Sequence, residues 1–91
     1  MSYILEYSKL AEKTLAKYKK SNPIAFIKCE RLLKEITDHP RTGTGHPKPL
    51  VQGNSIRYSR HISGEDVLIY NVYDDTVTVL VVSAEGHYDD K

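Results

Sequence analysis

Three strand-like segments joined by very short turns fill much of the second half of the chain, and they restrict its fold more than any other feature. The segments are rich in β-branched and aromatic residues and run over Ile56–Ile62, Val67–Tyr73 and Thr76–Ser83. Ser63-Gly64-Glu65 and Asp74-Asp75 supply the turns between them. Turns this short reverse the chain, so the sequence predicts successive strands that run antiparallel in one sheet.

Two amphipathic helices are predicted upstream of these strands. A short strand over Tyr3–Tyr7 leads into the first helix, and Ser8 is placed to cap its N-terminus. Asn22-Pro23 begins the second helix, which should end near His39-Pro40. The predicted architecture is therefore α+β, with an N-terminal strand and a two-helix hairpin packed on one face of an antiparallel β-sheet.

The connection between the second helix and the sheet is predicted to be extended but irregular. Gly43-Thr44-Gly45 favours a loop, and the two prolines of Pro47-Lys48-Pro49 cannot donate backbone hydrogen bonds to a sheet ladder. Because the glycines follow a helix and not a strand, they do not indicate a nucleotide-binding loop.

The length and composition fit a single small globular domain over residues 1–91. A chain of 91 residues can build one modest apolar core, and 40% hydrophobic with 27% charged residues is typical of a folded protein. Cys29 is the only cysteine and falls in the apolar pattern of the second helix, so we expect it in the core. No apolar run reaches the roughly 18 residues that a membrane span needs, and no secretion signal is evident. We therefore expect a cytoplasmic protein without membrane contact.

Charge is distributed unevenly along a chain whose net charge is only +1. Lys9, Lys13, Lys17 and Lys20 recur at helical spacing and form one basic stripe on the first helix, whereas the last third is rich in acid. A stripe of this kind is most often a solvated face. The net charge alone therefore argues neither for nor against binding of nucleic acid.

Residues alternate between two faces along the first of the three strands. One face holds Ile56, Tyr58, Arg60 and Ile62, and the other holds Arg57, Ser59 and His61. The apolar set should cover the helices, so the polar set is predicted to line the open face of the sheet. Arg60 breaks the apolar pattern, and two interpretations stay open: an arginine buried against a carboxylate or carbonyl oxygens, or a residue of the functional site.

The available residue types favour acid–base chemistry without a cofactor. The four histidines are His39, His46, His61 and His87, and they have no metal-binding spacing. Imidazoles, cations and tyrosines on an antiparallel sheet suit phosphodiester cleavage through the ribose 2′-hydroxyl. This reaction needs a proton acceptor, a proton donor and positive charge near the phosphate. A histidine near a chain end is equally compatible with a solvated surface position.

Four motifs in the second half of the chain resemble the Txe/YoeB family of toxins in their order and spacing. They are Gly43-Thr44-Gly45-His46-Pro47-Lys48-Pro49-Leu50, Tyr58-Ser59-Arg60-His61-Ile62, Val67-Leu68-Ile69-Tyr70 and His87-Tyr88. The resemblance implies a microbial-ribonuclease-like fold and the role of a toxin in a type II toxin–antitoxin system. It further implies a ribosome-dependent mRNA endoribonuclease that works by 2′-hydroxyl attack without a metal and inhibits translation.

The resemblance also implies catalytic roles for individual residues. His87 corresponds to the general acid that protonates the leaving 5′-oxygen, and Tyr88 corresponds to the terminal aromatic residue that positions the substrate. Arg60 and His61 lie where the family has two arginines, of which the second contacts phosphate. An imidazole therefore replaces a guanidinium at the second position.

Two further positions depart more strongly from the family pattern. Lys48 stands where the family usually has a glutamate proposed as general base, and Val67 stands where it has an arginine that stabilises the scissile phosphate. Lys48 is then a phosphate clamp, a strongly desolvated lysine base or a sign of weakened catalysis. Arg57 is the candidate to replace the missing arginine. The predicted substrate-binding set consists of Arg57, His46 and Ser59.

The partners implied by the resemblance are a cognate antitoxin, the ribosome and its mRNA. The antitoxin would be a DNA-binding repressor of the YefM/Phd type, so operator DNA would be bound only through it, and a homodimer is compatible with the family. Two alternatives to the enzyme stay open. One is a family member that binds the ribosome or antitoxin without cleaving RNA, which Lys48 and Val67 support. The other is an interaction domain unrelated to RNA, which the low net charge supports.

Overall fold

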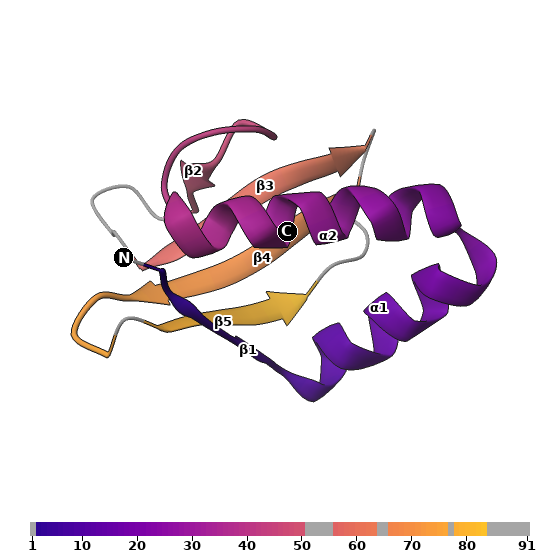
Figure 1. Cartoon of the computed structure of the whole chain (residues 1–91), viewed down its shortest axis with the longest axis horizontal. Helices are drawn as coiled ribbons and strands as arrows, with labels where there is room; N and C mark the ends of the chain where they lie inside the picture. The colour runs from indigo at the N-terminus through magenta and orange to yellow at the C-terminus, as the bar shows by residue number, and fades with distance from the viewer. Residues whose placement is uncertain (1, 51–55, 64–65, 77, 84–91) are drawn as a thin grey trace.

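The computed structural model describes residues 2–50, 56–63, 66–76 and 78–83. Within these ranges the chain forms five strands and two helices (Figure 1). They are β1 (Ile4–Tyr7), α1 (Lys9–Ser21), α2 (Pro23–Asp38), β2 (Lys48–Pro49), β3 (Arg57–Ser63), β4 (Asp66–Tyr73) and β5 (Thr78–Ser83). None of the helices in these ranges is long and apolar enough to span a bilayer.

Local sequence signals set the beginnings of both helices. The Ser8 hydroxyl accepts a hydrogen bond from the Ala11 N–H at 3.0 Å and so caps α1. The Asn22 side chain accepts a hydrogen bond from the Ala25 N–H at 3.3 Å, and Pro23 occupies the first turn of α2. Both predicted caps are confirmed.

The five strands form one sheet in the order β1-β5-β4-β3-β2. β3, β4 and β5 are antiparallel neighbours, as their short turns predict. β5 begins at Thr78, later than the predicted Thr76, because Asp74 to Thr76 form the turn. β1 pairs with β5 in parallel. The sequence did not indicate this pairing, since the two strands come from opposite ends of the chain and no short turn joins them.

The segment after α2 corrects the expectation of an irregular connection. Lys48–Pro49 forms the short edge strand β2, and Lys48 lies opposite Ser59 in its antiparallel pairing with β3. Proline is tolerated because an edge strand pairs on one side only. The next residue, Leu50, also donates its N–H to the Arg57 carbonyl oxygen at 3.0 Å. The pairing continues past the proline, and β2 is fixed to β3 along its length.

Both helices pack on one face of the sheet and enclose the core (Figure 1). From β3 this core receives Tyr58 and Ile62, as the alternation predicts. Ile56 was expected beside them, but it precedes the strand and is 43% exposed, so that part of the prediction is wrong. Cys29 is fully buried in the core, as predicted, and burial raises the pKa of its thiol to about 11.

Candidate functional site

The pairing of β2 with β3 gathers five of the predicted site residues on the face of the sheet away from the helices. They are His46, Lys48, Arg57, Ser59 and His61, defined here as the open-face cluster. Lys48 lies directly opposite Ser59, so their side chains share a face. The imidazole rings of His46 and His61 meet edge to face, with 6.3 Å between their centroids. The structure thus unites residues from two separate segments of the chain.

The members of the open-face cluster differ in the surface that they offer. His46, Lys48 and His61 are exposed, and Arg57 is half-buried. Ser59 has the predicted direction but is only 7% exposed, so it gives a substrate little access. The cluster therefore presents two imidazoles and one ammonium group to solvent, beside a partly shielded guanidinium.

Arg57 is oriented by a residue that the sequence did not identify as part of a site. Its Nε donates to Asn71 Oδ1 at 2.9 Å, and Asn71 Nδ2 donates to the Tyr73 hydroxyl at 3.0 Å. Asn71 lies opposite Arg57 in the pairing of β3 with β4. The available signal was an asparagine within a strand whose other central residues are apolar, since such a residue needs a polar partner.

The two departures from the family pattern both lie on this face. Val67 is opposite His61 in the pairing of β3 with β4, so an aliphatic side chain borders the cluster at the position where an arginine was expected. Lys48 is exposed, whereas a lysine that acts as a base must be desolvated. Of the three roles open to Lys48, contact with a phosphate group therefore fits its surroundings better than proton abstraction.

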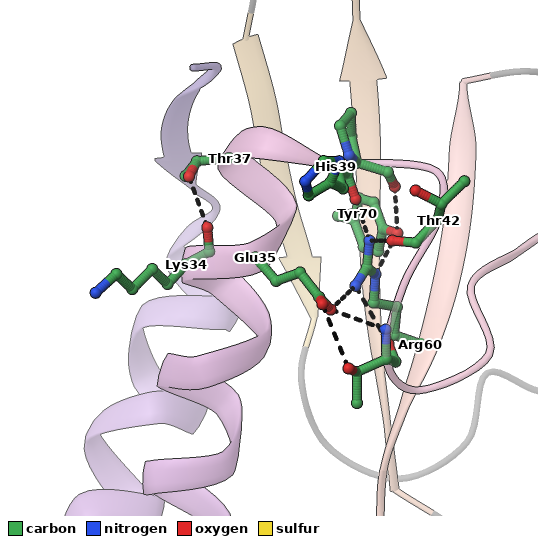
Figure 2. A network of polar contacts seen from close by, with 9 residues as sticks. Lys34, Glu35, Thr37, His39, Thr42, Arg60 and Tyr70 are labelled. Carbon is green, nitrogen blue, oxygen red and sulfur yellow. Dashed lines mark hydrogen bonds and ion pairs between the residues drawn. The ribbon is translucent and has the colours of Figure 1, made fainter. Parts of the chain in front are cut away.

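Arg60 lies on the inner face of β3 and is completely buried (Figure 2). Its Nε donates to the Tyr70 hydroxyl at 2.9 Å, and one terminal nitrogen donates to Glu35 at 2.7 Å. The remaining acceptors are the carbonyl oxygens of Thr44 at 3.2 Å, Thr42 at 2.6 Å and His39. A guanidinium has five N–H groups, and five acceptors surround this one. The buried-arginine interpretation is therefore right, and a direct contact between Arg60 and a substrate does not fit this arrangement.

Glu35 and Tyr70 complete the surroundings of Arg60, and sequence reasoning missed both. The Glu35 carboxylate accepts hydrogen bonds from the Thr44 N–H at 2.8 Å and from Arg60. The Thr44 N–H and, after it, the Arg60 charge lower the pKa of Glu35. The Tyr70 hydroxyl donates to the Pro40 carbonyl oxygen at 2.7 Å, and burial raises its pKa. Glu35 follows the buried Leu32 by three residues, and residues three apart lie on the same side of a helix. This spacing was the signal that Glu35 faces the sheet.

The backbone just before β2 has an unusual conformation. Gly45 has φ of +87°, and His46, which is not a glycine, has φ of +52°. The Gly45 carbonyl oxygen accepts a hydrogen bond from the His61 N–H at 2.8 Å. A Cβ atom at Gly45 would lie 2.9 Å from the His61 carbonyl oxygen, so only glycine allows this close approach. The approach is what brings His46 next to His61.

Two of the predicted catalytic residues, His87 and Tyr88, lie outside the described residues. Their roles stay predictions. Within the described part of the chain, no group of three or more His, Cys, Asp and Glu side chains is placed to hold a metal ion.

The open-face cluster is suited to an anionic ligand. All of its members are basic or neutral, and its exposed groups can donate hydrogen bonds to a phosphate oxygen. Histidine can also accept or release a proton near neutral pH. The arrangement therefore places hydrogen-bond donors suited to an anion and two imidazole groups on a single surface.

Sequence comparison finds relatives over most of the chain. Residues 7–88 match the family described as YoeB-like toxin of bacterial type II toxin-antitoxin system. The chain is 43% identical over 58 residues to Toxin YoeB of Mycobacterium bovis, and the aligned segment covers 64% of this chain and 66% of that protein. It is 36% identical over 61 residues to Toxin YoeB of Escherichia coli, and this alignment covers 67% of this chain and 70% of that protein. The matched segments thus span about two thirds of the length of these relatives.

Solved structures share the fold over nearly the whole chain. A YoeB/ParE toxin from Agrobacterium tumefaciens superposes with a TM-score of 0.85 at 21% identity, covering 93% of this chain and 99% of that one. A YoeB dimer from Staphylococcus aureus gives 0.83 at 26% identity, and a YoeB-YefM complex from the same organism gives 0.79 at 27%. Each of these two covers 97% of this chain and 100% of the other. The predicted α+β fold is confirmed.

Proposed function

Because the chain belongs to the family of YoeB-like toxins of bacterial type II toxin–antitoxin systems, we propose that it is a cytoplasmic, ribosome-dependent mRNA endoribonuclease that inhibits translation. The open-face cluster is the observation that carries this proposal. It places imidazoles and cations from β2, β3 and the preceding connection on one accessible face. Such a surface suits an RNA phosphate and the proton transfers that accompany its cleavage.

In the proposed reaction, a basic group of the site takes the proton of the ribose 2′-hydroxyl, and the 2′-oxygen attacks the adjacent phosphorus atom. The bond from phosphorus to the 5′-oxygen breaks, which leaves a cyclic phosphate and a free 5′-hydroxyl group. His87 is assigned to protonate the leaving oxygen and Tyr88 to stack on a base. Lys48 and Arg57 supply positive charge at the phosphate. The atoms balance without a metal or another reactant, so no cofactor is required.

A second candidate function is binding without cleavage, at the ribosome or at the antitoxin. The specific observation in its favour is Val67, which borders the open-face cluster opposite His61. An aliphatic side chain there cannot stabilise charge on a phosphate. A protein of this kind would stall translation and leave the message intact.

The proposal includes a cognate antitoxin as partner, a DNA-binding repressor of the YefM/Phd type through which operator DNA is reached. The relative in the YoeB-YefM complex supports this inference. Two surface features of the helices do so as well. The basic stripe on α1 borders a groove that includes Lys13 and Lys20, and α2 exposes Ile24 to 81% and Ile27 to 50% beside Lys28. Together these surfaces suit an acidic segment with regularly spaced apolar residues. The YoeB dimer from Staphylococcus aureus supports a homodimer.

The experiment that tests this function uses purified ribosomes carrying a defined mRNA. The expected result is cleavage of the message within the ribosome, and its loss when a single 2′-deoxy nucleotide replaces the ribose at the cut site. Stalled ribosomes with intact mRNA would support the binding function instead. Cleavage at the deoxy position would exclude 2′-hydroxyl attack. Addition of the co-expressed antitoxin should suppress cleavage, and unchanged activity in that complex would rule out direct inhibition.

A further inference from the structure

The buried Arg60 side chain joins three parts of the molecule that are distant in the sequence. Figure 2 shows it between Glu35 on α2, the connection around His39 and Thr42, and Tyr70 on β4. Three of its five acceptors are backbone carbonyl oxygens of the connection between α2 and β2. Glu35 binds the same connection independently, through the Thr44 N–H. The connection is therefore held from inside the core, along the stretch that leads directly to the open-face cluster.

The end of this connection needs such support because its backbone is unfavourable. His46 has φ of +52°, which is uncommon for a residue with a side chain, and Pro47 follows it and restricts it further. Residues in such conformations persist only when surrounding contacts fix them. The observed contacts are the Arg60 and Glu35 bonds to Thr44 and the hydrogen bond from the His61 N–H to Gly45. They fix the chain before His46, and the pairing of Lys48 with Ser59 fixes the chain after it.

We infer that Arg60 is a positioning residue, which with Glu35 holds the connection against β3 so that His46 and Lys48 stand beside His61 on the open face. This inference rests on the proposed function only for its effect on RNA cleavage. The juxtaposition of His46 and His61 is a property of the fold and is measurable without a substrate. Arg60 thus acts on the site from the opposite face of the strand that carries His61.

The geometry requires arginine and not merely a positive charge. The acceptors around Arg60 lie on α2, on β4 and on three residues of the connection, so five donors in one plane are needed to reach them. A lysine has three donors at a single nitrogen atom. Arg60→Lys keeps the charge and much of the aliphatic stem but cannot hold α2, β4 and the connection simultaneously.

The test compares Arg60→Lys with Leu33→Ala, which destabilises the core from α2 at a residue outside this hydrogen-bond network. Amide hydrogen exchange reports the docking directly, because the His61 N–H is bonded to Gly45. The Val72 N–H, bonded to the Ile56 carbonyl oxygen at the other end of β3, is the internal reference. In Arg60→Lys, protection at His61 should fall by about tenfold or more relative to Val72, since local opening is separate from global unfolding. In Leu33→Ala, the two amides should change together.

The second readout is cleavage of ribosome-bound mRNA. Displacement of catalytic groups by about 1 Å can cost roughly 10²-fold in rate, so Arg60→Lys should lower kcat by about this factor with little change in KM. Wild-type protection at His61 in a folded Arg60→Lys protein would overturn the inference. So would a loss of protection at His61 relative to Val72 that is as large in Leu33→Ala as in Arg60→Lys. If the wild-type protein does not cleave RNA, the proposed function fails and hydrogen exchange still decides the positioning role.

Two milder variants keep the inference testable if Arg60→Lys does not fold. Glu35→Gln leaves the partly exposed side chain in place but removes the charge and one of the two equivalent acceptor oxygens. Gly45→Ala forces the connection away from the β3 backbone and leaves the guanidinium of Arg60 in the sequence. Both variants should reduce protection at His61 relative to Val72. Unchanged protection in both would overturn the inference as surely as in Arg60→Lys.

Discussion

Arg57 and Arg60 lie three residues apart on β3, yet their surroundings are opposite. Arg60 points into the core, is fully buried and donates to five acceptors. Arg57 points to the open face, is half-buried and donates through its Nε to Asn71. The two faces of one strand thus hold arginines in opposite environments. We propose that the inner arginine positions the connection that carries the site and that the outer arginine supplies charge to a ligand.

The largest expected effect is on catalysis and concerns His87, the proposed general acid. His87→Ala should reduce the rate of mRNA cleavage by about 10²- to 10⁴-fold, the usual span for a positioned general acid. The melting temperature should change little, because the role is chemical. Single-turnover cleavage on ribosomes, together with thermal unfolding, measures both quantities. A variant that folds, binds ribosomes and cleaves at the wild-type rate would overturn the assignment.

The largest expected effect on stability belongs to the inner face. Arg60→Ala removes the guanidinium that donates to Glu35, the Tyr70 hydroxyl and three carbonyl oxygens, so the free energy of unfolding should fall by about 3–5 kcal/mol. Urea unfolding at neutral pH measures the change. Arg57→Ala is the matched control on the same strand, and it should cost much less. Equal losses in the two variants would break the division between the faces.

The open face should show the reverse pattern for its cations. Lys48→Ala and Arg57→Ala should each lower the cleavage rate by about 10²-fold or more, the size typical of losing one positioned electrostatic group. Stability should change little in Lys48→Ala because the side chain is exposed. Rates at the wild-type level in both variants would show that the phosphate is stabilised elsewhere, and would favour the binding function.

Acid should weaken the inner face by protonating the Glu35 carboxylate. The pKa of Glu35 is lowered in the folded protein, so its contribution to stability is present above the pKa of the unfolded chain and is lost as the pH falls through the folded value. The pKa of Asp74 is also lowered, by hydrogen bonds from Tyr3 and Arg41. The free energy of unfolding should therefore decline as the pH falls from about 5 to about 3, and the difference between wild type and Glu35→Gln should shrink. A constant difference over this range would contradict the assignment of charge to Glu35.

The two faces also differ in how far the sequence predicted them. Alternation along β3 placed Tyr58, Ile62 and the polar set correctly, since side-chain direction in a strand is a local property. The caps at Ser8 and Asn22 followed from local signals as well. The contacts of Arg60 could not be predicted, because they depend on where α2 and the connection meet the sheet.

The same distinction between local and tertiary contacts applies to the residues of the site. Proline in β2 argued against pairing, and only its edge position in the folded sheet allows Lys48 to lie opposite Ser59. The link from Glu35 to Thr44 and the parallel pairing of β1 with β5 likewise join segments distant in the chain. The sequence therefore supplied candidate residues for the site, and tertiary contacts determined which of them meet.

The smallest expected effect concerns Arg41. Its variant tests whether the stability lost in Arg60→Ala comes from burial or from ion pairing alone. Arg41 binds Asp74 through two hydrogen bonds of 3.2 and 3.1 Å. The ion pair is therefore bidentate, which is the favourable geometry for an arginine and a carboxylate. The Arg41 side chain is 28% exposed and that of Asp74 is 60% exposed. Solvent screens such a pair, so Arg41→Ala should change urea unfolding only slightly, and less as salt is added. Arg60→Ala should lose the same stability at low and high salt, because the guanidinium that it removes is completely buried and shielded from mobile ions. Two outcomes would show that charge pairing alone accounts for the loss of stability in both variants. One is a loss in Arg60→Ala that depends on salt, and the other is a loss in Arg41→Ala as large as that in Arg60→Ala.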